Sequence, residues 1–310
     1  MLTATQKRTA EAIVNIFETS EVRGNYGSVT VIPDDTGHLT FGRSQTTLGS
    51  GNLHDMMSQY CDNAGARFGR DLTPYLPRLR DRDVSLDTDR HLHNVLRAAA
   101  DDPVMRDTQD VFFDVRYWAP AARAADRSGI TTPLGVAVVY DSSVQGSWTL
   151  LRDRTNAAVG TAAAAGERPW ITRYVAERRA WLAGHSRRDL RQTVYRMDAF
   201  WRLIELEAWS LNLPLVVRDA EISPASLAAS PRGCYDGPEP GSRPLAVQSP
   251  LQRGLDVRLV QLGLSTRGAD IRADGIFGQG AARSVREFQA AHGTPVTGIA
   301  DVALIAMLVA

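Results

Sequence analysis

One stretch of the chain, between Asp219 and Pro250, is crowded with proline and glycine. Proline lacks a backbone donor and glycine adds conformational freedom, so such a stretch is typical of a linker rather than of a packed core. The 310 residues also exceed the roughly 150 residues of an average domain. We therefore expect an N-terminal domain over residues 1–220, a linker over 221–249 and a small C-terminal module over 250–310.

The composition excludes several classes of protein. Hydrophobic residues make up 44% of the chain, enough for a sizeable core, and 35 Lys and Arg balance 35 Asp and Glu. A zero net charge argues against a nucleic-acid binder, which needs cations for phosphate. No apolar run approaches the ~20 residues of a membrane span, and residues 1–8 lack the apolar core of a signal peptide. We expect synthesis in the cytoplasm, no membrane insertion and a monomer.

Three short helices are predicted in the C-terminal module. The first is apolar along one face, the second follows a glycine-rich turn, and the third follows a break at Gly293 and Pro295. The residues that mark them are Leu255, Leu259, Leu262 and Leu264, then Asp274-Gly275-Ile276-Phe277-Gly278 with Val285, Phe288 and Gln289, and last Val302, Leu304, Ile305 and Leu308. Such helices suffice for one small core.

The order of these motifs resembles the three-helix peptidoglycan-binding module of many cell-wall enzymes. Two segments depart from that family, which usually has Leu-Gln where this chain has Val260-Gln261 and a Pro, a polar residue and Thr at positions 279–281. The resemblance implies peptidoglycan as a partner and gives the module's motif residues as Asp274, Phe277 and Gln289. The alternative is a helical cap for oligomerisation.

The N-terminal domain begins with a predicted helix followed directly by a β-hairpin. Thr3 and Gln6 have the spacing of a capping box, and apolar residues at 13–17 give the helix a buried face. Residues 28–32 are β-rich, 33–37 form a turn, and 38–42 return to extended chain. The expected fold class is mainly α with a small β-hairpin or sheet.

Two carboxyl groups lie in contrasting positions of this arrangement. Glu18 is at the end of the helix behind its apolar face, and Asp35 is on the solvated hairpin turn. Glycosidases need two carboxyl groups whose environments separate their roles as acid and base. The spacing alone is also compatible with capping or solvated acids.

A larger set of motifs resembles the glycoside hydrolase family 46 chitosanases of the lysozyme-like superfamily, in order over nearly the whole N-terminal domain. The matching segments are Ile16-Phe17-Glu18, Asn25-Tyr26-Gly27, residues 35–43, Gln109-Asp110 through Tyr117-Trp118 and Pro120, residues 138–146, Arg196-Met197-Asp198 and residues 212–218. The resemblance implies a two-lobed, lysozyme-like catalytic domain ahead of the three-helix module.

The resemblance also implies roles for individual residues. Glu18 matches the family's general acid, Asp35 its general base, and Thr40 the threonine that helps to hold the attacking water. The family inverts the anomeric configuration, which requires room for a water between acid and base.

A supporting network is implied for Asp141, Arg178 and Arg196. Asp141 ends the apolar run that starts at Val136, where an unpaired charge would be costly. Arg178 is followed by a second arginine, Arg179, so the match at this position is less distinct than that of Arg196.

The sequence departs from the family where the substrate is recognised. Chitosanases carry an acid after a glycine for the substrate's ammonium group, whereas this chain has Asn52 after Gly51. An amide cannot pair with an ammonium but can hydrogen-bond an N-acetyl group. With Tyr26 and Arg43 as further candidate substrate-binding residues, this favours an N-acetylated polymer.

We therefore expect a peptidoglycan glycan-strand hydrolase of muramidase type, without a metal or another cofactor, delivered to the wall as a phage endolysin by a holin or as an effector by a secretion system. One alternative is a chitosanase that hydrolyses β-1,4-linked glucosamine polymers. Another is a non-catalytic wall-binding or structural protein. The six histidines show no convergent metal-ligand spacing; His91 and His93, two apart, point in different directions on a helix.

Overall fold

The computed structural model describes residues 2–43 and 45–309, which form two compact units. The first unit comprises Met1–Gly24 and Phe113–Ala229, and the second comprises Asn25–Phe112 and Ser230–Ala310. The chain therefore passes between the units three times, and the N-terminal domain expected from the sequence contributes to both. No described helix is long and apolar enough to cross a membrane.

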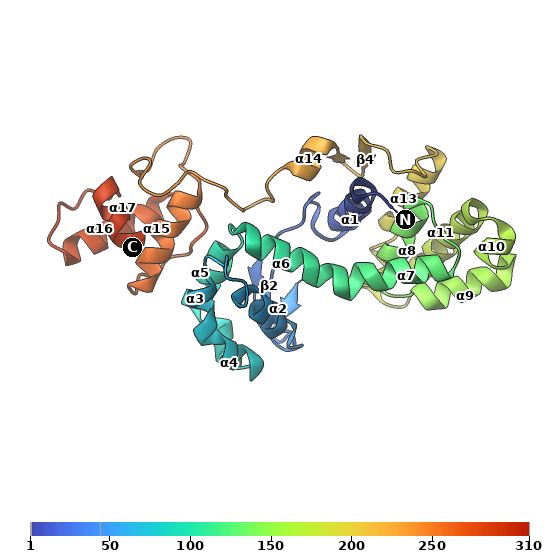
Figure 1. Cartoon of the computed structure of the whole chain (residues 1–310), viewed down its shortest axis with the longest axis horizontal. Coiled ribbons are helices and arrows are strands. Elements are labelled where there is room, and N and C mark those ends of the chain that lie inside the picture. The colour runs from blue at the N-terminus through green and yellow to red at the C-terminus, as the bar shows by residue number, and fades with distance from the viewer. Residues whose placement is uncertain (1, 44, 310) are drawn as a thin grey trace. The chain divides into compact units, whose positions relative to one another are not determined.

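The first unit is built around helix α8 (Pro133–Gln145), whose residues from Leu134 to Ser142 are all buried. A helix that is apolar on every side needs neighbours on every side. Helices α1 (Ala4–Thr19), α7 (Ala119–Arg127) and α11 (Glu167–Ala183) pack against it (Figure 1). The remaining elements are η3 (Asp114–Trp118), α9 (Trp148–Val159), α10 (Ala162–Ala165), α12 (Arg188–Arg191), α13 (Tyr195–Glu205), β4 (Leu215–Val217), β5 (Ala220–Ile222) and α14 (Pro224–Ala228).

Helix α1 has the predicted capping box, in which the Thr3 hydroxyl accepts from Gln6 N and the Gln6 amide accepts from Thr3 N. Its buried face includes Ile13, Ile16 and Phe17. The helix ends at Thr19, and Ser20 adopts a left-handed conformation. Glu18 therefore lies in the last helical turn.

A three-stranded antiparallel sheet in the second unit contains the predicted hairpin. Strands β1 (Val29–Thr30) and β2 (Thr40–Phe41) pair with Thr30 opposite Thr40. Strand β3 (Thr46–Thr47), which the sequence did not predict, pairs with β2. The helices of this part are α2 (Asn52–Cys61), α3 (Gly69–Leu72), η1 (Thr73–Tyr75), α4 (Leu76–Arg80), η2 (Val84–Thr88), α5 (Arg90–Ala99) and α6 (Pro103–Phe113).

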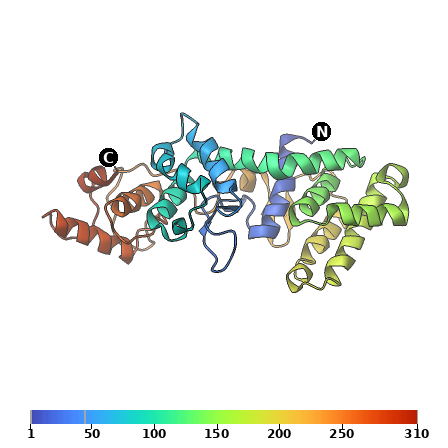
Figure 2. The same ribbon diagram turned by 90° about the horizontal axis from the view of Figure 1, so that it is seen from below.

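The C-terminal module consists of the three expected helices, α15 (Leu255–Thr266), α16 (Gln279–Ala291) and α17 (Val302–Val309). They enclose a small core that includes Phe277 and Val285. In both views the three helices, drawn in orange to red, lie together (Figures 1 and 2). Helix α15 packs directly on α5, so the module belongs to the same compact unit as the hairpin.

Polar groups fasten the module to α5. The buried side chain of Asn94 donates to Ser265 Oγ at 3.0 Å and to the Ile271 carbonyl at 2.8 Å, and it accepts from Ala273 N at 2.9 Å. Arg258 Nη1 donates to the Arg97 carbonyl at 2.9 Å. These hydrogen bonds hold the module against α5.

Part of the expected linker also packs into the second unit. Cys234 is buried with Tyr26 and Ala100, and Tyr235 N donates to Asp101 Oδ1 at 2.8 Å. The division into a domain over residues 1–220, a linker over 221–249 and a module over 250–310 stays a prediction. These contacts show that Cys234 and Tyr235 pack against the second unit rather than extend through solvent.

A buried ion pair joins Arg258 Nε of the module to Asp101 Oδ2 at 2.9 Å. Burial raises the pKa of Asp101 to about 7, although Arg258 opposes this change. Above pH 7 the Asp101 carboxylate is therefore ionised, and Arg258 stabilises its charge.

We expect Arg258→Met to destabilise the second unit by about 3–5 kcal/mol above this pH, because an ionised Asp101 would stay buried without its partner. Removing Arg258 raises the folded-state pKa of Asp101 further, so the difference from the parent protein grows as pH rises through 7. Thermal unfolding of the variant and the parent protein at about pH 5.5 and about pH 8.5 measures this difference in stability. Arg90→Met, which removes an exposed pair with Asp270, is the control, and an equal, pH-independent effect of both variants contradicts the prediction.

Candidate active site

The carboxylate of Glu18 is presented at the surface of the first unit by a buried arginine. Its side chain is 44% exposed, whereas Arg196, which forms an ion pair with it, is 3% exposed. Arg196 lies on α13, and its guanidinium stacks over the Phe17 ring with 5.5 Å to the centroid. Because the arginine is buried and packed on the Phe17 ring, it positions the carboxylate at the end of α1.

Arg196 is held in turn by Asp141, in the middle of the buried helix α8. Arg196 Nη1 donates to Asp141 Oδ1 at 2.8 Å, and Arg178 Nη1 donates to Asp141 Oδ2 at 2.6 Å. Arg178 also bonds Ser142 Oγ at 2.9 Å and Gln145 Oε1 at 2.5 Å. The structure thus brings together Glu18 and the three residues of the expected network.

The neighbouring arginines Arg178 and Arg179 have different surroundings. Arg178 and Asp141 are both 0% exposed, whereas Arg179 pairs with Asp198 on the surface, where both side chains are about half exposed. The buried aspartate therefore contacts Arg178 rather than Arg179.

The charges of the network support one another. Burial by itself would lower the pKa of Arg196, but the carboxylates of Asp141 and Glu18 raise it above its ordinary value. Arg196 therefore stays charged, as a group that positions a carboxylate must.

Asp35 lies on the exposed turn of the hairpin in the second unit. Its backbone N donates to the Ile32 carbonyl at 3.2 Å, and its carbonyl accepts from His38 N at 3.3 Å. A Cβ at Gly37 would lie 2.7 Å from Asp35 Oδ2, and a Cβ at Gly49 would lie 2.1 Å from the Thr36 carbonyl oxygen. Both glycines therefore let the chain pass closely around the aspartate.

Thr40 is half-buried on β2, and its hydroxyl donates to the His38 carbonyl at 3.0 Å. The turn between Asp35 and Thr40 is fastened by Asp87, which sequence reasoning missed. Asp87 Oδ1 accepts from Leu39 N at 2.7 Å, and Asp87 Oδ2 lies 2.8 Å from His38 Nδ1. No local signal pointed to this residue, because it follows the turn by about 50 positions and lies in a short 3₁₀ helix.

Tyr26 and Arg43, expected to bind substrate, have structural positions instead. Tyr26 is 1% exposed, so its ring offers no face to a sugar. Its hydroxyl donates to Asp110 Oδ1 at 2.5 Å, and Arg43 pairs with the same carboxylate while only 5% exposed itself. Gln109 joins them by accepting from Arg43 N at 3.0 Å and donating to the Tyr26 carbonyl at 3.1 Å. This cluster fixes the chain between the hairpin and α6.

Asn52 is the first residue of α2 and is half-buried. It follows Gly51, which has a positive φ of 82° and a nearby guanidinium from Arg82. The Asn52 side chain therefore lies at the N-terminus of α2. Its role in substrate recognition stays a prediction.

The three motif residues of the module have structural positions. Phe277 is 0% exposed in the module's core. Asp274 Oδ1 accepts from Gln261 Nε2 and Ile276 N at 2.9 Å each, and Gln289 bonds four groups of the loop 297–299. They hold the turn and the loop, and their part in binding a wall polymer stays a prediction. Among the described residues, no group of three His, Cys, Asp or Glu could hold a metal ion.

Glycoside hydrolases use a pair of carboxyl groups. This chain has one carboxyl group anchored by buried charges and a second one on an exposed turn bordered by glycines. Residues 12–215 match the model of glycosyl hydrolase family 46, and residues 253–308 match that of a peptidoglycan binding domain. The chain therefore belongs to glycosyl hydrolase family 46, with a C-terminal peptidoglycan-binding module.

Relatives and solved structures agree with this assignment. A chitosanase of Bacillus subtilis (strain 168) is 31% identical over 233 residues, which are 70% of this chain and 83% of that protein. A mutant chitosanase from Bacillus subtilis MY002 complexed with 6 GlcN has 28% identity and a TM-score of 0.56, over 70% of this chain and 96% of that one. A Gynuella sunshinyii chitosanase in complex with chitotetraose has 26% identity and a TM-score of 0.57, over 72% and 98%.

Proposed function

We propose that this protein is a chitosanase, which hydrolyses β-1,4-linked glucosamine polymers by direct displacement. The observation that carries the proposal is the anchoring of Glu18 by the buried network of Arg196, Asp141 and Arg178. Burying three charges costs desolvation free energy, so their presence behind one exposed carboxylate supports a role in positioning that group. The relatives described as chitosanases, two of them in complex with amino-sugar oligomers, support glucosamine polymer as the substrate.

In the proposed reaction, Glu18 transfers its proton to the glycosidic oxygen as the bond to the anomeric carbon breaks. A water molecule attacks that carbon, and Asp35 accepts the proton that the water loses. Thr40, whose hydroxyl is fixed on β2, helps to hold the water. The new sugar end has the inverted configuration.

A second candidate substrate is the glycan strand of peptidoglycan. Two observations favour it: the module over residues 253–308, and Asn52 at the position where the family carries an acid. An amide suits an N-acetyl group better than an ammonium. For this substrate the enzyme would act as a muramidase on the cell wall after a holin or a secretion system has delivered it.

Parallel digestion of fully deacetylated chitosan and purified peptidoglycan tests the proposal. New reducing ends are quantified, and the released fragments are analysed by mass spectrometry. We expect faster release from chitosan. Faster release of fragments ending in N-acetylmuramic acid would show that the enzyme is a muramidase and not a chitosanase. Wall binding without cleavage of either polymer would refute both functions.

A further inference from the structure

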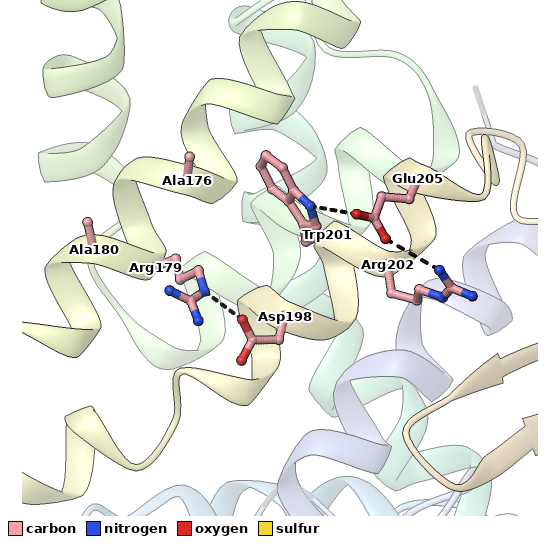
Figure 3. Close-up of a pocket in the computed structure, with 7 residues that line it drawn as sticks. All are labelled: Ala176, Arg179, Ala180, Asp198, Trp201, Arg202 and Glu205. Carbon is pink, nitrogen blue, oxygen red and sulfur yellow. Dashed lines mark hydrogen bonds and ion pairs between the residues drawn. The ribbon is translucent and has the colours of Figure 1, made fainter.

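A cavity of about 570 Å³ lies on the surface of the first unit, away from the anchor of Glu18. Helices α11 and α13 form it side by side (Figure 3). Arg196 and Trp201 are five residues apart on α13, which places them about 140° apart around the helix. Arg196 is buried and Trp201 is exposed, so the cavity and the Glu18 network use different faces of α13.

One aromatic wall and two small residues give the cavity its apolar part. Trp201 is 37% exposed, whereas Trp148, Trp170 and Trp209 are 1–8% exposed in the core. Across from it, Ala176 and Ala180 lie one turn apart on α11 and leave room beside the indole. An exposed tryptophan next to alanines is what a flat apolar ligand face can stack on.

A hydrogen bond orients the indole, and polar side chains surround it. Trp201 Nε1 donates to Glu205 Oε1 at 3.1 Å, and Glu205 Oε2 accepts from Arg202 at 3.4 Å. On the other side, Arg179 Nε donates to Asp198 Oδ1 at 2.6 Å. Figure 3 shows these two hydrogen-bonded groups flanking the space between the helices.

This combination is chemically suited to a saccharide. A pyranose ring with equatorial substituents has an apolar C–H face for stacking and a rim of hydroxyls for hydrogen bonds. Arginine and carboxylate side chains offer planar donors and acceptors for that rim, with more positions than their mutual pairs use. The cavity volume lies within the range of small-molecule sites.

The charges select among amino sugars. Two arginines and two acids line the cavity, and each acid bonds an arginine. The two guanidinium charges repel a glucosamine ammonium and offset the attraction of the two carboxylates, whereas an N-acetyl group is neutral and needs only hydrogen bonds. The equal numbers of arginines and acids in the cavity therefore favour an N-acetylated unit.

We propose that this cavity is a second saccharide-binding site, which takes an N-acetylated hexosamine unit of a β-1,4-linked glycan. The nature of the polymer rests on the proposed function, since an enzyme that cuts such a chain gains from holding an uncut part of it. The site would give partly acetylated polymer an additional contact that short, deacetylated oligomers lack.

The direct test is a titration followed by the indole N–H resonance of Trp201 in the ¹⁵N-labelled full chain, assigned with Trp201→Phe. We expect the trisaccharide of N-acetylglucosamine to shift this resonance and the trisaccharide of glucosamine to bind at least about tenfold more weakly. Absence of any shift, or tighter binding of the glucosamine trisaccharide, overturns the proposal. The readout is independent of hydrolysis.

A functional test uses Trp201→Ala with Leu206→Ala as the control, since Leu206 is an exposed apolar residue just beyond α13 and outside the cavity. We expect Trp201→Ala to weaken binding to insoluble N-acetylated glycan about tenfold while it leaves hydrolysis of a soluble glucosamine hexamer unchanged. Equal binding by both variants refutes the second site. Failure of the parent protein to hydrolyse any glycan, with an intact indole titration, refutes only the proposed function.

Discussion

Glu18→Gln is expected to lower the rate of glycan hydrolysis by roughly 100- to 10,000-fold, the usual contribution of a general acid. Glutamine keeps the size and an acceptor oxygen for Arg196 but has no proton to give to the leaving oxygen. The fold should be retained, because the Glu18 side chain is 44% exposed and contributes no buried charge. Initial rates of reducing-end formation on chitosan measure the effect.

The matched control is Glu221→Gln, which neutralises an exposed acid on β5 of the same unit. It should leave the rate within about twofold of the parent protein, since surface substitutions are usually mild. Asp35→Asn should match Glu18→Gln in severity, because an amide cannot take the proton of the attacking water. A Glu18→Gln enzyme that retains full activity would contradict the assignment of the acid.

Arg178→Met is expected to lower the stability of the first unit by about 3–5 kcal/mol. Arg178 is one of two arginines that bond the fully buried Asp141, and methionine would leave half of that carboxylate without a partner. At about 2–4 °C per kcal/mol for a unit of this size, the melting temperature should fall by roughly 10 °C. Calorimetry or circular dichroism detects such a shift.

The adjacent arginine provides an unusually close control. Arg179 pairs with Asp198 in a position where both side chains are 51% exposed, so Arg179→Met should change stability by less than about 1 kcal/mol. Similar losses for the two variants would show that the buried network does not stabilise the fold in the manner described.

Local signals in the sequence predicted the elements that carry the site. The spacing of Thr3 and Gln6 predicted the start of α1, and the β-rich and extended segments around the turn at 33–37 predicted the hairpin of β1 and β2. The three helices of the module also followed from apolar spacing. In each case the deciding interaction joins residues close in sequence, which is what a pattern can record.

Interactions between distant segments could not be predicted in this way. Asp87 lies 49 positions from His38, which it contacts, and Arg258 lies 161 positions from the Arg97 carbonyl. Tyr26 is a candidate substrate-binding residue by sequence, but its ring is buried against Ala100 and Cys234. Which side of a tyrosine faces solvent depends on the packing of segments far away in the chain.

The network around Asp141 shows where family resemblance added what patterns could not. Asp141 is 37 residues from Arg178 and 55 from Arg196, so no spacing rule joins them. The apolar run before Asp141 indicated only that its charge would need a partner. The matched motifs supplied the partners, and the structure places all three in contact.

The configuration of the first product shows whether hydrolysis proceeds by direct displacement, with Glu18 as the acid and Asp35 as the base. A glucosamine hexamer is digested in deuterated buffer, and proton NMR follows the anomeric signals before mutarotation equilibrates them. We expect the α-anomer to appear first, and neither Glu18→Gln nor Asp35→Asn to produce it at a comparable rate. Initial appearance of the β-anomer would show a retaining reaction and contradict the role of Asp35 as a base.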